Sequence, residues 1–277
     1  RVWREGGTFQ EWGEHFDLGR WQRAMDAEGL SPDWFVHRHR AEDEREEGDG
    51  WPWSVPCVRQ LLDDGLRFTA PVTFLVGENG SGKSTLVEAL AEGFGLDSWG
   101  GSAGYKYATW REPSVLGGRM KFEATAAGRR MLRGPRTRRR GFFLRAETAL
   151  DTLDREQKSG RLSGAADEMS HGEGFLMAFR ERFQEPGLYV LDEPEAALSF
   201  ASCLQLVGLL HELGRSGAQI ICATHSPVLT ALPGAEIIEV GDHGMRPAGW
   251  RDLELVDHWR RYLDDPWTYL RHIVDTR

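Results

Sequence analysis

The sequence lacks any long apolar run. No stretch comes near the ~18 consecutive apolar residues that a membrane-spanning helix needs, and the N-terminus lacks the basic-then-apolar pattern of a secretion signal. We therefore expect no direct insertion into a membrane and a cytoplasmic location, with any link to a membrane made through a partner.

Cysteine is scarce, with three among 277 residues. Cys57, Cys203 and Cys222 are far apart, and no two have the spacing of a zinc or redox pair. We interpret them as small buried hydrophobic residues in a reducing compartment.

Positive charge is also in the minority, since the net charge is −9, which argues against a general nucleic-acid coat protein. One segment departs from this balance: Arg129–Arg140 reads RRMLRGPRTRRR and holds seven arginines. Clustered arginines bind nucleic-acid phosphates, but they also pair with acidic residues of their own protein. The acidic composition favours the second reading, and both stay open.

The chain is long enough for one large domain with an appendage. Residues 1–50 carry tryptophans among many charges without clean periodicity, and we predict a poorly ordered N-terminal extension there. Residues 51–277 form the organised domain, with a glycine- and arginine-rich lobe at about 95–185. Strands alternate with helices in this domain, which predicts an α/β fold with a mostly parallel central sheet flanked by helices. The predicted strands are Pro71–Val76, Gly141–Arg145, Leu188–Leu191, Gln219–Ala223 and Glu236–Val240, and the predicted helices are Gly174–Phe183, Thr85–Ala91, Ala196–Leu213 and Trp259–Val274, the last interrupted at Pro266.

The strongest motif is Gly77–Ser84, GENGSGKS, between a predicted strand and a predicted helix. It fits G-x-x-x-x-G-K-[ST] without a mismatch. Glycines let the backbone N–H groups approach phosphates closely, and the positive end of the helix dipole points at them. Lys83 adds a charge for the outer phosphates, and the Ser84 hydroxyl is a hard oxygen ligand suited to Mg²⁺.

Two further strands end in polar residues. Asp192 and Glu193 follow LYVL, and in parallel sheets ligands bind at the carboxyl ends of the strands. Asp192 can then hold Mg²⁺, and Glu193 can polarise an attacking water. His225 follows QIICAT, where an imidazole can reach a terminal phosphate or that water.

A fourth motif, MSHGEG at Met169–Gly174, stands before an apolar helix. Its serine and small residues at a helix N-terminus make an anion site. A plain N-cap with an acidic residue at the third helical position explains the same residues, and on this stretch alone we favour that explanation.

In this order the four motifs resemble those of the ABC-type ATPases. GENGSGKST resembles the Walker A motif, LYVLDEPEAALS the Walker B motif and D-loop, ATHS the switch-histidine region, and MSHGE the signature motif. The SHGE form is more similar to predicted ATPases of the AAA family than to transporter ATPases. The resemblance covers about Trp51 to Arg277, and it implies a P-loop NTPase fold with ABC-type antiparallel β and helical subdomains.

The resemblance also implies roles for single residues. Asp192 and Ser84 would associate with Mg²⁺, Glu193 would be the catalytic base, and His225 the switch, with Lys83 assisting catalysis. Ser170 and Gly172 would contact ATP bound to a second subunit, which implies an ATP-dependent homodimer. The ATP-binding residues would be Glu78, Asn79, Gly80, Ser81, Gly82, Lys83, Ser84 and Thr85.

The sequence departs from the family in three places. Ser199 stands where transporter ATPases carry the D-loop aspartate, and His171 replaces a signature glycine. The Q-loop glutamine is not evident, and Glu147 is a candidate replacement. No residue for stacking on adenine is identified, and we consider Trp53, Phe68 and Tyr105.

Three functions compete at this stage. The first is ATP binding and hydrolysis in which ATP-gated dimerisation acts on a protein partner or on DNA. The second is the ATPase subunit of a membrane transporter, which the SHGE form disfavours. The third is a switch that binds nucleotide without hydrolysing it, and the presence of both Glu193 and His225 disfavours it.

Overall fold

The computed structural model describes residues 34–38, 50–102, 114–124, 139–149 and 186–274, with residues 151, 158, 176, 177, 179–181 and 183. Within these residues no helix combines the length and the apolar character needed to cross a bilayer. The strands are β1 (Trp34–Arg38), β2 (Leu66–Phe68), β3 (Val72–Val76), β4 (Gly101–Ser102), β5 (Met120–Ala124), β6 (Gly141–Arg145), β7 (Leu188–Asp192), β8 (Gln219–Thr224), β9 (Glu236–Gly241) and β10 (Gly244–Pro247). The α-helices are α3 (Pro56–Asp64), α4 (Lys83–Phe94), α5 (Val115–Gly118), α8 (Phe200–Arg215), α9 (Glu254–Asp264) and α10 (Trp267–Leu270), and the 3-10 helices are η5 (Ala146–Thr148), η7 (Pro194–Ala197), η8 (Leu229–Ala231) and η9 (Trp250–Asp252).

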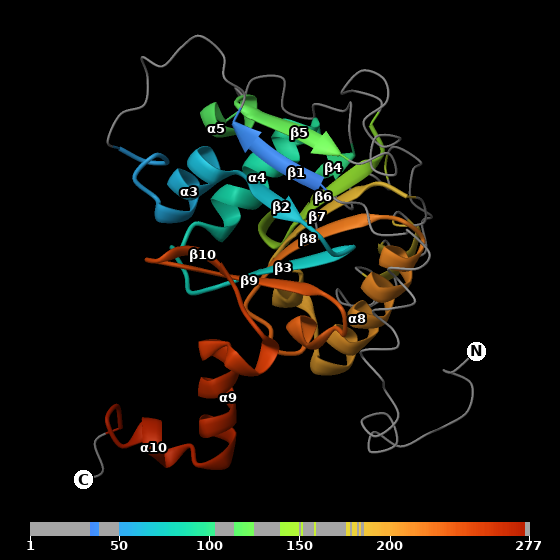
Figure 1. Ribbon diagram of the computed structural model, residues 1–277. Coiled ribbons are helices and arrows are strands. Elements are labelled where there is room, and N and C mark those ends of the chain that lie inside the picture. The colour runs from blue at the N-terminus through green and yellow to red at the C-terminus, as the bar shows by residue number, and fades with distance from the viewer. Residues whose placement is uncertain are drawn as a thin grey trace.

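The central sheet has seven strands in the order β10-β9-β3-β8-β7-β6-β4 (Figure 1). The five strands from β9 to β6 are parallel to their neighbours, and β10 and β4 pair antiparallel at the two edges. This confirms the predicted fold class. It also places the C-terminal ends of β3, β7 and β8 at one edge of the sheet, where ligands bind in such folds.

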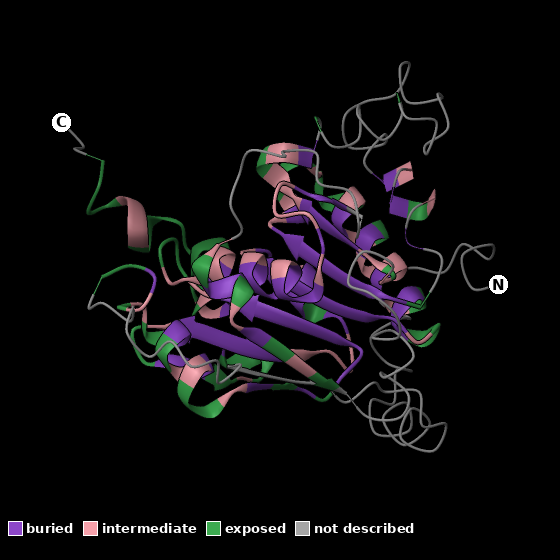
Figure 2. Cartoon of the chain, turned by 90° about the horizontal axis from the view of Figure 1, so that it is seen from above, coloured by how far each residue is buried: buried purple, intermediate pink, exposed green. Residues whose placement is uncertain are grey.

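Two apolar layers enclose this sheet. Successive side chains of a strand point to opposite faces. On β3, Leu75 accordingly packs with α3 and α4, whereas Phe74 and Val76 pack with α8 on the other face. Figure 2 shows the buried strands between the helices. The three cysteines lie buried and free in these layers, as predicted.

A smaller antiparallel sheet of order β2-β1-β5 lies on the α4 side of the central sheet (Figure 1). Its middle strand β1 pairs Phe35 with Arg67 on β2 and with Glu123 on β5. Residues 34–38 come from the stretch predicted to be an extension outside the domain, and the structure joins these five residues to the small sheet. A strand this short in a charged segment gives no local signal, because its pairing partners lie far away in the sequence.

Two predicted helices differ from the observed ones. The predicted helix Ala196–Leu213 is a 3-10 turn, η7, followed by α8, which begins at Phe200 because Ser199 accepts a hydrogen bond from the N–H of Ser202 and caps it. The predicted C-terminal helix is α9 and α10, separated near Pro266 as expected, and α9 begins at Glu254.

Candidate active site

The phosphate loop connects the end of β3 to the start of α4 and depends on its glycines. A Cβ at Gly77 would lie 2.0 Å from the carbonyl oxygen of Val240. Gly82 has a φ of 99°, and a Cβ there would lie 2.6 Å from the sulfur of Cys57. A side chain at Gly77 would clash with the backbone of Val240, and one at Gly82 would clash with the side chain of Cys57 and strain the positive φ. The loop therefore has the compact shape that brings its N–H groups close to a bound anion.

Lys83 lies inside this loop with 3% of its surface exposed. Its Nζ donates hydrogen bonds to the carbonyl oxygens of Gly77 and Glu78, both at 2.8 Å. Burial lowers the pKa of the ammonium, and the nearby charges of Glu193 and Asp192 raise it again. The side chain thus places a buried cation where the loop amides converge.

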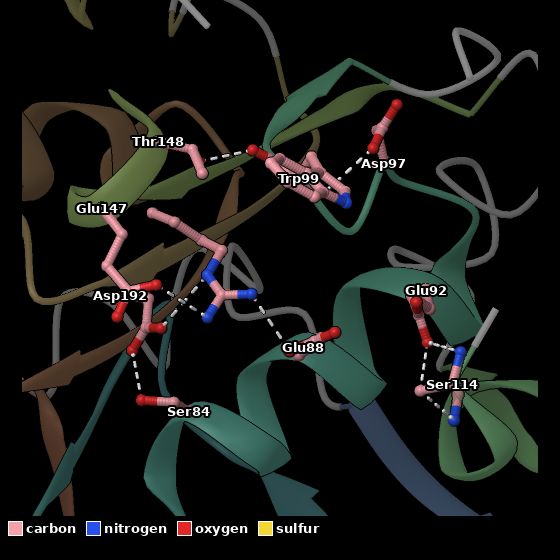
Figure 3. A network of polar contacts seen from close by, with 11 residues as sticks. Ser84, Glu88, Glu92, Asp97, Trp99, Ser114, Glu147, Thr148 and Asp192 are labelled. Atoms are coloured by element: carbon pink, nitrogen blue, oxygen red, sulfur yellow. Dashed lines mark hydrogen bonds and ion pairs between the residues drawn. The ribbon is translucent and has the colours of Figure 1, made fainter. Parts of the chain in front are cut away.

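Ser84 and Asp192 meet across the sheet edge. The Ser84 hydroxyl, in the first turn of α4, donates to Oδ1 of Asp192 at the end of β7 over 3.0 Å (Figure 3). Asp192 is 6% exposed. Burial raises its pKa from 3.8 to about 6, while the hydrogen bond from Ser84 and the charge of Arg145 act in the opposite direction. A hydroxyl and a buried carboxylate are hard oxygen ligands, so this pair fits Mg²⁺.

The raised pKa predicts that Asp192 destabilises the free protein. Between pH 3.8 and about 6 the folded chain keeps a proton that the unfolded chain loses, so stability falls as the pH rises through this window. Asp192→Asn removes the penalty. We expect the free energy of unfolding of this variant to exceed that of the wild type by on the order of 2–3 kcal/mol at pH 8. At pH 5 the difference should be about half as large.

Urea unfolding in EDTA, without nucleotide, measures this difference. Asp264→Asn, at an exposed position on α9, is the matched control and should show no such gain. Equal stability of wild type and Asp192→Asn at pH 8 would contradict the prediction.

Glu193 and His225 face each other next to this pair. Glu193 has a φ of 51°, and it is the one described residue other than glycine with a positive φ. Its N–H donates to the carbonyl oxygen of Ala223 at 2.9 Å, which fixes the turn. One carboxylate oxygen lies 3.2 Å from Nε2 of His225, without the geometry of a hydrogen bond. A left-handed backbone at a non-glycine residue costs about 1–3 kcal/mol and is typical of functional sites.

Glu195 holds the backbone next to this histidine through contacts that the sequence analysis missed. Its Oε1 accepts hydrogen bonds from the Thr224 hydroxyl at 2.7 Å and from the N–H of His225 at 2.6 Å. Its place two residues after Glu193 in DEPEAALS is the only sequence signal, and nothing in that pattern names the partner. The two glutamates thus contact His225 from different sides, one at its backbone and one at its ring.

Arg145 at the end of β6 is a second residue that the analysis did not single out. Its guanidinium lies 3.1 Å from Glu88 on α4 and 3.8 Å from Asp192. The candidate Q-loop residue Glu147 has a side chain that is 82% exposed and lies 3.5 Å from the same guanidinium. Arg145, rather than Glu147, therefore faces the carboxylate on β7, and Figure 3 shows Glu88, Glu147 and Asp192 around that position.

The aromatic candidates for stacking on a base are not supported by the described structure. Phe68 is 1% exposed and belongs to the apolar layer on the α3 and α4 side of the sheet. Trp53 packs against that layer, and the Arg119 guanidinium lies 4.7 Å from its ring centroid. Tyr105 lies outside the described residues, as do Ser170, His171 and Gly172.

The arginine-rich segment is described only at its end. Arg139 donates a hydrogen bond to the carbonyl oxygen of Phe94 over 3.0 Å, and its guanidinium lies 5.3 Å from the Phe94 ring centroid. A cation at the C-terminal end of α4 interacts favourably with the helix dipole. This arginine therefore has a structural contact within its own chain, while residues 129–138 lie outside the described residues.

Two family models match the sequence in the regions that form this site. A model described as "AAA domain" matches residues 58–106, which include the phosphate loop. A model described as "AAA domain, putative AbiEii toxin, Type IV TA system" matches residues 174–231, which include Asp192, Glu193 and His225.

Two similar proteins are named as ABC transporters. The ABC multidrug transporter SNQ2 of Candida glabrata is 29% identical over 197 residues, or 62% of this chain. ABC transporter G family member 22 of Arabidopsis thaliana is 29% identical over 171 residues, or 56% of this chain. The aligned part is 12% of the first protein and 23% of the second, so the chain spans only a fraction of their length.

One relative is of comparable length. The cytochrome c biogenesis ATP-binding export protein CcmA of Rhodospirillum rubrum is 29% identical over 216 residues, covering 73% of this chain and 89% of that protein. Among solved structures, cbiO1 of Clostridium perfringens, part of the ABC transporter complex cbiONQ, superposes with a TM-score of 0.43 at 17% identity over 76% of this chain and 90% of that one. The family matches and the relatives, together with the arrangement of Lys83, Ser84 and Asp192, support an ABC-type P-loop ATPase with similarity to the AAA domains.

Proposed function

We propose that the chain binds ATP on the phosphate loop and hydrolyses its terminal phosphoanhydride bond. The observation that carries this proposal is the meeting of Ser84 and Asp192 at 3.0 Å beside the Lys83 ammonium. These groups come from α4 and β7, which are far apart in the sequence, and they meet where a triphosphate on the loop would end. Charge stabilisation of this kind provides most of the catalysis in phosphoryl transfer.

Ser84 and Asp192 would hold Mg²⁺, which would neutralise charge on the phosphate oxygens. These residues fit the ion because Asp192 is a buried carboxylate. Without a bound cation, burial disfavours its charged form and raises its pKa. Lys83 would exchange its two loop carbonyls for phosphate oxygens. The loop N–H groups would hold the remaining oxygens, with Thr85 following in the first turn of α4.

Glu193 would accept a proton from the attacking water. Glu193 directly follows β7 in a turn with a φ of 51°, and its carboxylate lies 3.2 Å from the imidazole of His225. Glu195 would keep that imidazole in place through the backbone N–H of His225. When a base and a second polar group contact the same water, they orient that water for attack in line with the leaving group.

The same proposal includes ATP-dependent dimerisation. Ser170 and Gly172 of one copy would contact the ATP held by the other, so that closure completes the site and excludes water. This closure would drive a protein partner or a DNA-linked process. A second candidate, the ATPase subunit of a membrane transporter, is favoured by the names of the relatives, which are transporters or an export protein.

Phosphate release from ATP by the purified chain, measured while Mg²⁺ is varied, tests the activity. We expect saturable Mg²⁺-dependent turnover, and a Mg²⁺ requirement about tenfold higher for Ser84→Ala because one ligand is lost. Ser202→Ala, on α8, is the matched control and should behave as the wild type. Absence of Mg²⁺-dependent phosphate release by the wild type would contradict the proposal.

A further inference from the structure

A cleft of about 710 Å³ opens beside the phosphate loop. One side is formed by Gly77–Ser81 of the loop, and another by the end of β9 and its turn into β10, including Asp242 and His243. The far side consists of four ring-bearing side chains from α9 and α10, which we call the C-terminal wall: His258, Trp259, Tyr262 and Tyr269. Sites for small organic ligands span roughly 300–1,000 Å³, so the cleft is large enough for the nucleoside part of a nucleotide.

We propose that the C-terminal wall binds the base and ribose of the nucleotide whose phosphates lie on the loop. This inference rests on the proposed function and adds the subsite for the nucleoside. Neither the phosphate-loop motif nor the strand-end carboxylates identify such a subsite.

The strand order gives the direction of the nucleotide. In the sheet, β3 lies between β8 and β9, and β7 with Asp192 lies beyond β8. The terminal phosphate must reach Asp192 and Ser84, so the triphosphate runs from the loop toward the β7 side. Its other end then leaves the loop toward β9, where the cleft and the C-terminal wall lie.

The wall offers flat apolar surface to a ligand. Trp259 is 47% exposed and Tyr262 is 38% exposed, although both are large rings. Exposed rings that line one cleft next to an anion-binding loop are suited to stacking on a base, because stacking hides apolar surface on both partners. The polar atoms of His243 and Glu254, which line the same cleft, can hydrogen-bond to a ribose or to a base edge.

The base of the wall is fixed to the body of the protein. Leu253, which precedes α9, and Val256 in its first turn are buried in the apolar layer on the α8 side of the sheet. The indole N–H of Trp250 donates to the carbonyl oxygen of Pro227 at 3.0 Å. Further out, Tyr269 of α10 contacts His258 of α9 through a 2.8 Å polar contact between its hydroxyl and Nδ1. The wall therefore projects from the sheet as one unit (Figure 1).

Binding calorimetry with two probes tests the inference: adenylyl imidodiphosphate, which carries the nucleoside, and inorganic tripolyphosphate, which does not. Both are titrated with Mg²⁺ into the full chain. We expect Trp259→Ala to weaken binding of the first probe about tenfold and to change binding of the second less than twofold. Tyr262→Ala should show the same pattern.

Trp267→Ala is the matched control, because Trp267 is a 48% exposed tryptophan on α10 that does not line the cleft. It should leave both affinities unchanged. Unchanged affinity of Trp259→Ala and Tyr262→Ala for adenylyl imidodiphosphate overturns the inference, as does equal wild-type affinity for the two probes. A loss of ATP-induced dimerisation with unchanged nucleotide affinity would assign the wall to contact with a second copy and also overturn it. A wild type that binds neither probe overturns the proposed function itself.

Discussion

Glu193→Gln is expected to lower kcat for ATP hydrolysis by at least about 100-fold, because a positioned general base contributes roughly 10²–10⁴ to the rate. The amide keeps the size and shape of the carboxylate but cannot accept the proton of the attacking water. Phosphate binding should change little, since the loop amides, Lys83 and Ser84 remain. Single-turnover phosphate release and nucleotide affinity, measured on the same variant, separate the two effects.

A matched control comes from α8. Glu212→Gln makes the same chemical change at an exposed residue of that helix, and it should leave kcat within twofold of the wild type. Equal rates for Glu193→Gln and the wild type would show that Glu193 is not the base. His225, whose Nε2 lies 3.2 Å from the Glu193 carboxylate, would then be the next candidate for the base.

The same variant tests the dimer. If hydrolysis opens the ATP-bound dimer, blocking it should let the dimer accumulate, and gel filtration with Mg-ATP should show a shift to twice the mass. Without ATP, or with Mg-ADP, the variant should elute as a monomer. A monomer under all three conditions would contradict ATP-gated dimerisation while leaving the hydrolysis reaction untouched.

The sequence predicts the nucleotide end of this fold well, because its signals are local. The loop glycines, the lysine and the two strand-end carboxylates each lie within a few residues of the strand or helix that positions them. Once the strands are parallel, their C-terminal ends must share one edge of the sheet, so Ser84 and Asp192 meet even though they are distant in sequence. For this reason Pro71–Val76, Leu188–Leu191 and Gln219–Ala223 were predicted within about one residue of β3, β7 and β8.

Other features depend on contacts that leave no local pattern. The strand β1 exists because it pairs with β2 and β5, and its five residues alone favour no element. Arg145 follows a buried strand just as many surface arginines do, and only the arrangement of β6, β7 and α4 brings it to Asp192 and Glu88. The sequence does not predict the C-terminal wall, because the pattern of α9 is that of an ordinary exposed helix. Only the fold places its rings in the same cleft as the phosphate loop.

Glu195 illustrates how a correct motif can still hide a role. In DEPEAALS the pair Asp192 and Glu193 accounts for metal binding and proton transfer, so a third acid has no assigned chemistry. In the structure, the Glu195 carboxylate accepts hydrogen bonds from the backbone N–H of His225 and from the Thr224 hydroxyl. This contact couples the end of β8 to the turn after β7, and it arises from tertiary packing rather than from residue spacing.

Lys83→Met should abolish the stabilisation of the protein by nucleotide. The wild type should gain about 2.7 kcal/mol of stability when ATP is present at 100 times its Kd. In the variant the ammonium that would contact the outer phosphates is gone, and we expect at least about a 100-fold loss of affinity, so the same ATP concentration gives almost no gain. Thermal unfolding with and without Mg-ATP measures the difference.

The stability of the nucleotide-free variant distinguishes a lost contact from a lost fold. Removing a buried ammonium relieves a desolvation penalty of several kcal/mol, whereas losing its two hydrogen bonds to the carbonyls of Gly77 and Glu78 costs about 1.5–3 kcal/mol each. These effects have opposite signs and similar size. We therefore expect the free energy of unfolding of Lys83→Met without nucleotide to lie within about 1 kcal/mol of the wild-type value. The control Lys121→Met removes a half-exposed lysine on β5 and should keep the full ATP-dependent gain in stability. A full gain in stability for Lys83→Met would show that the triphosphate does not lie on this loop.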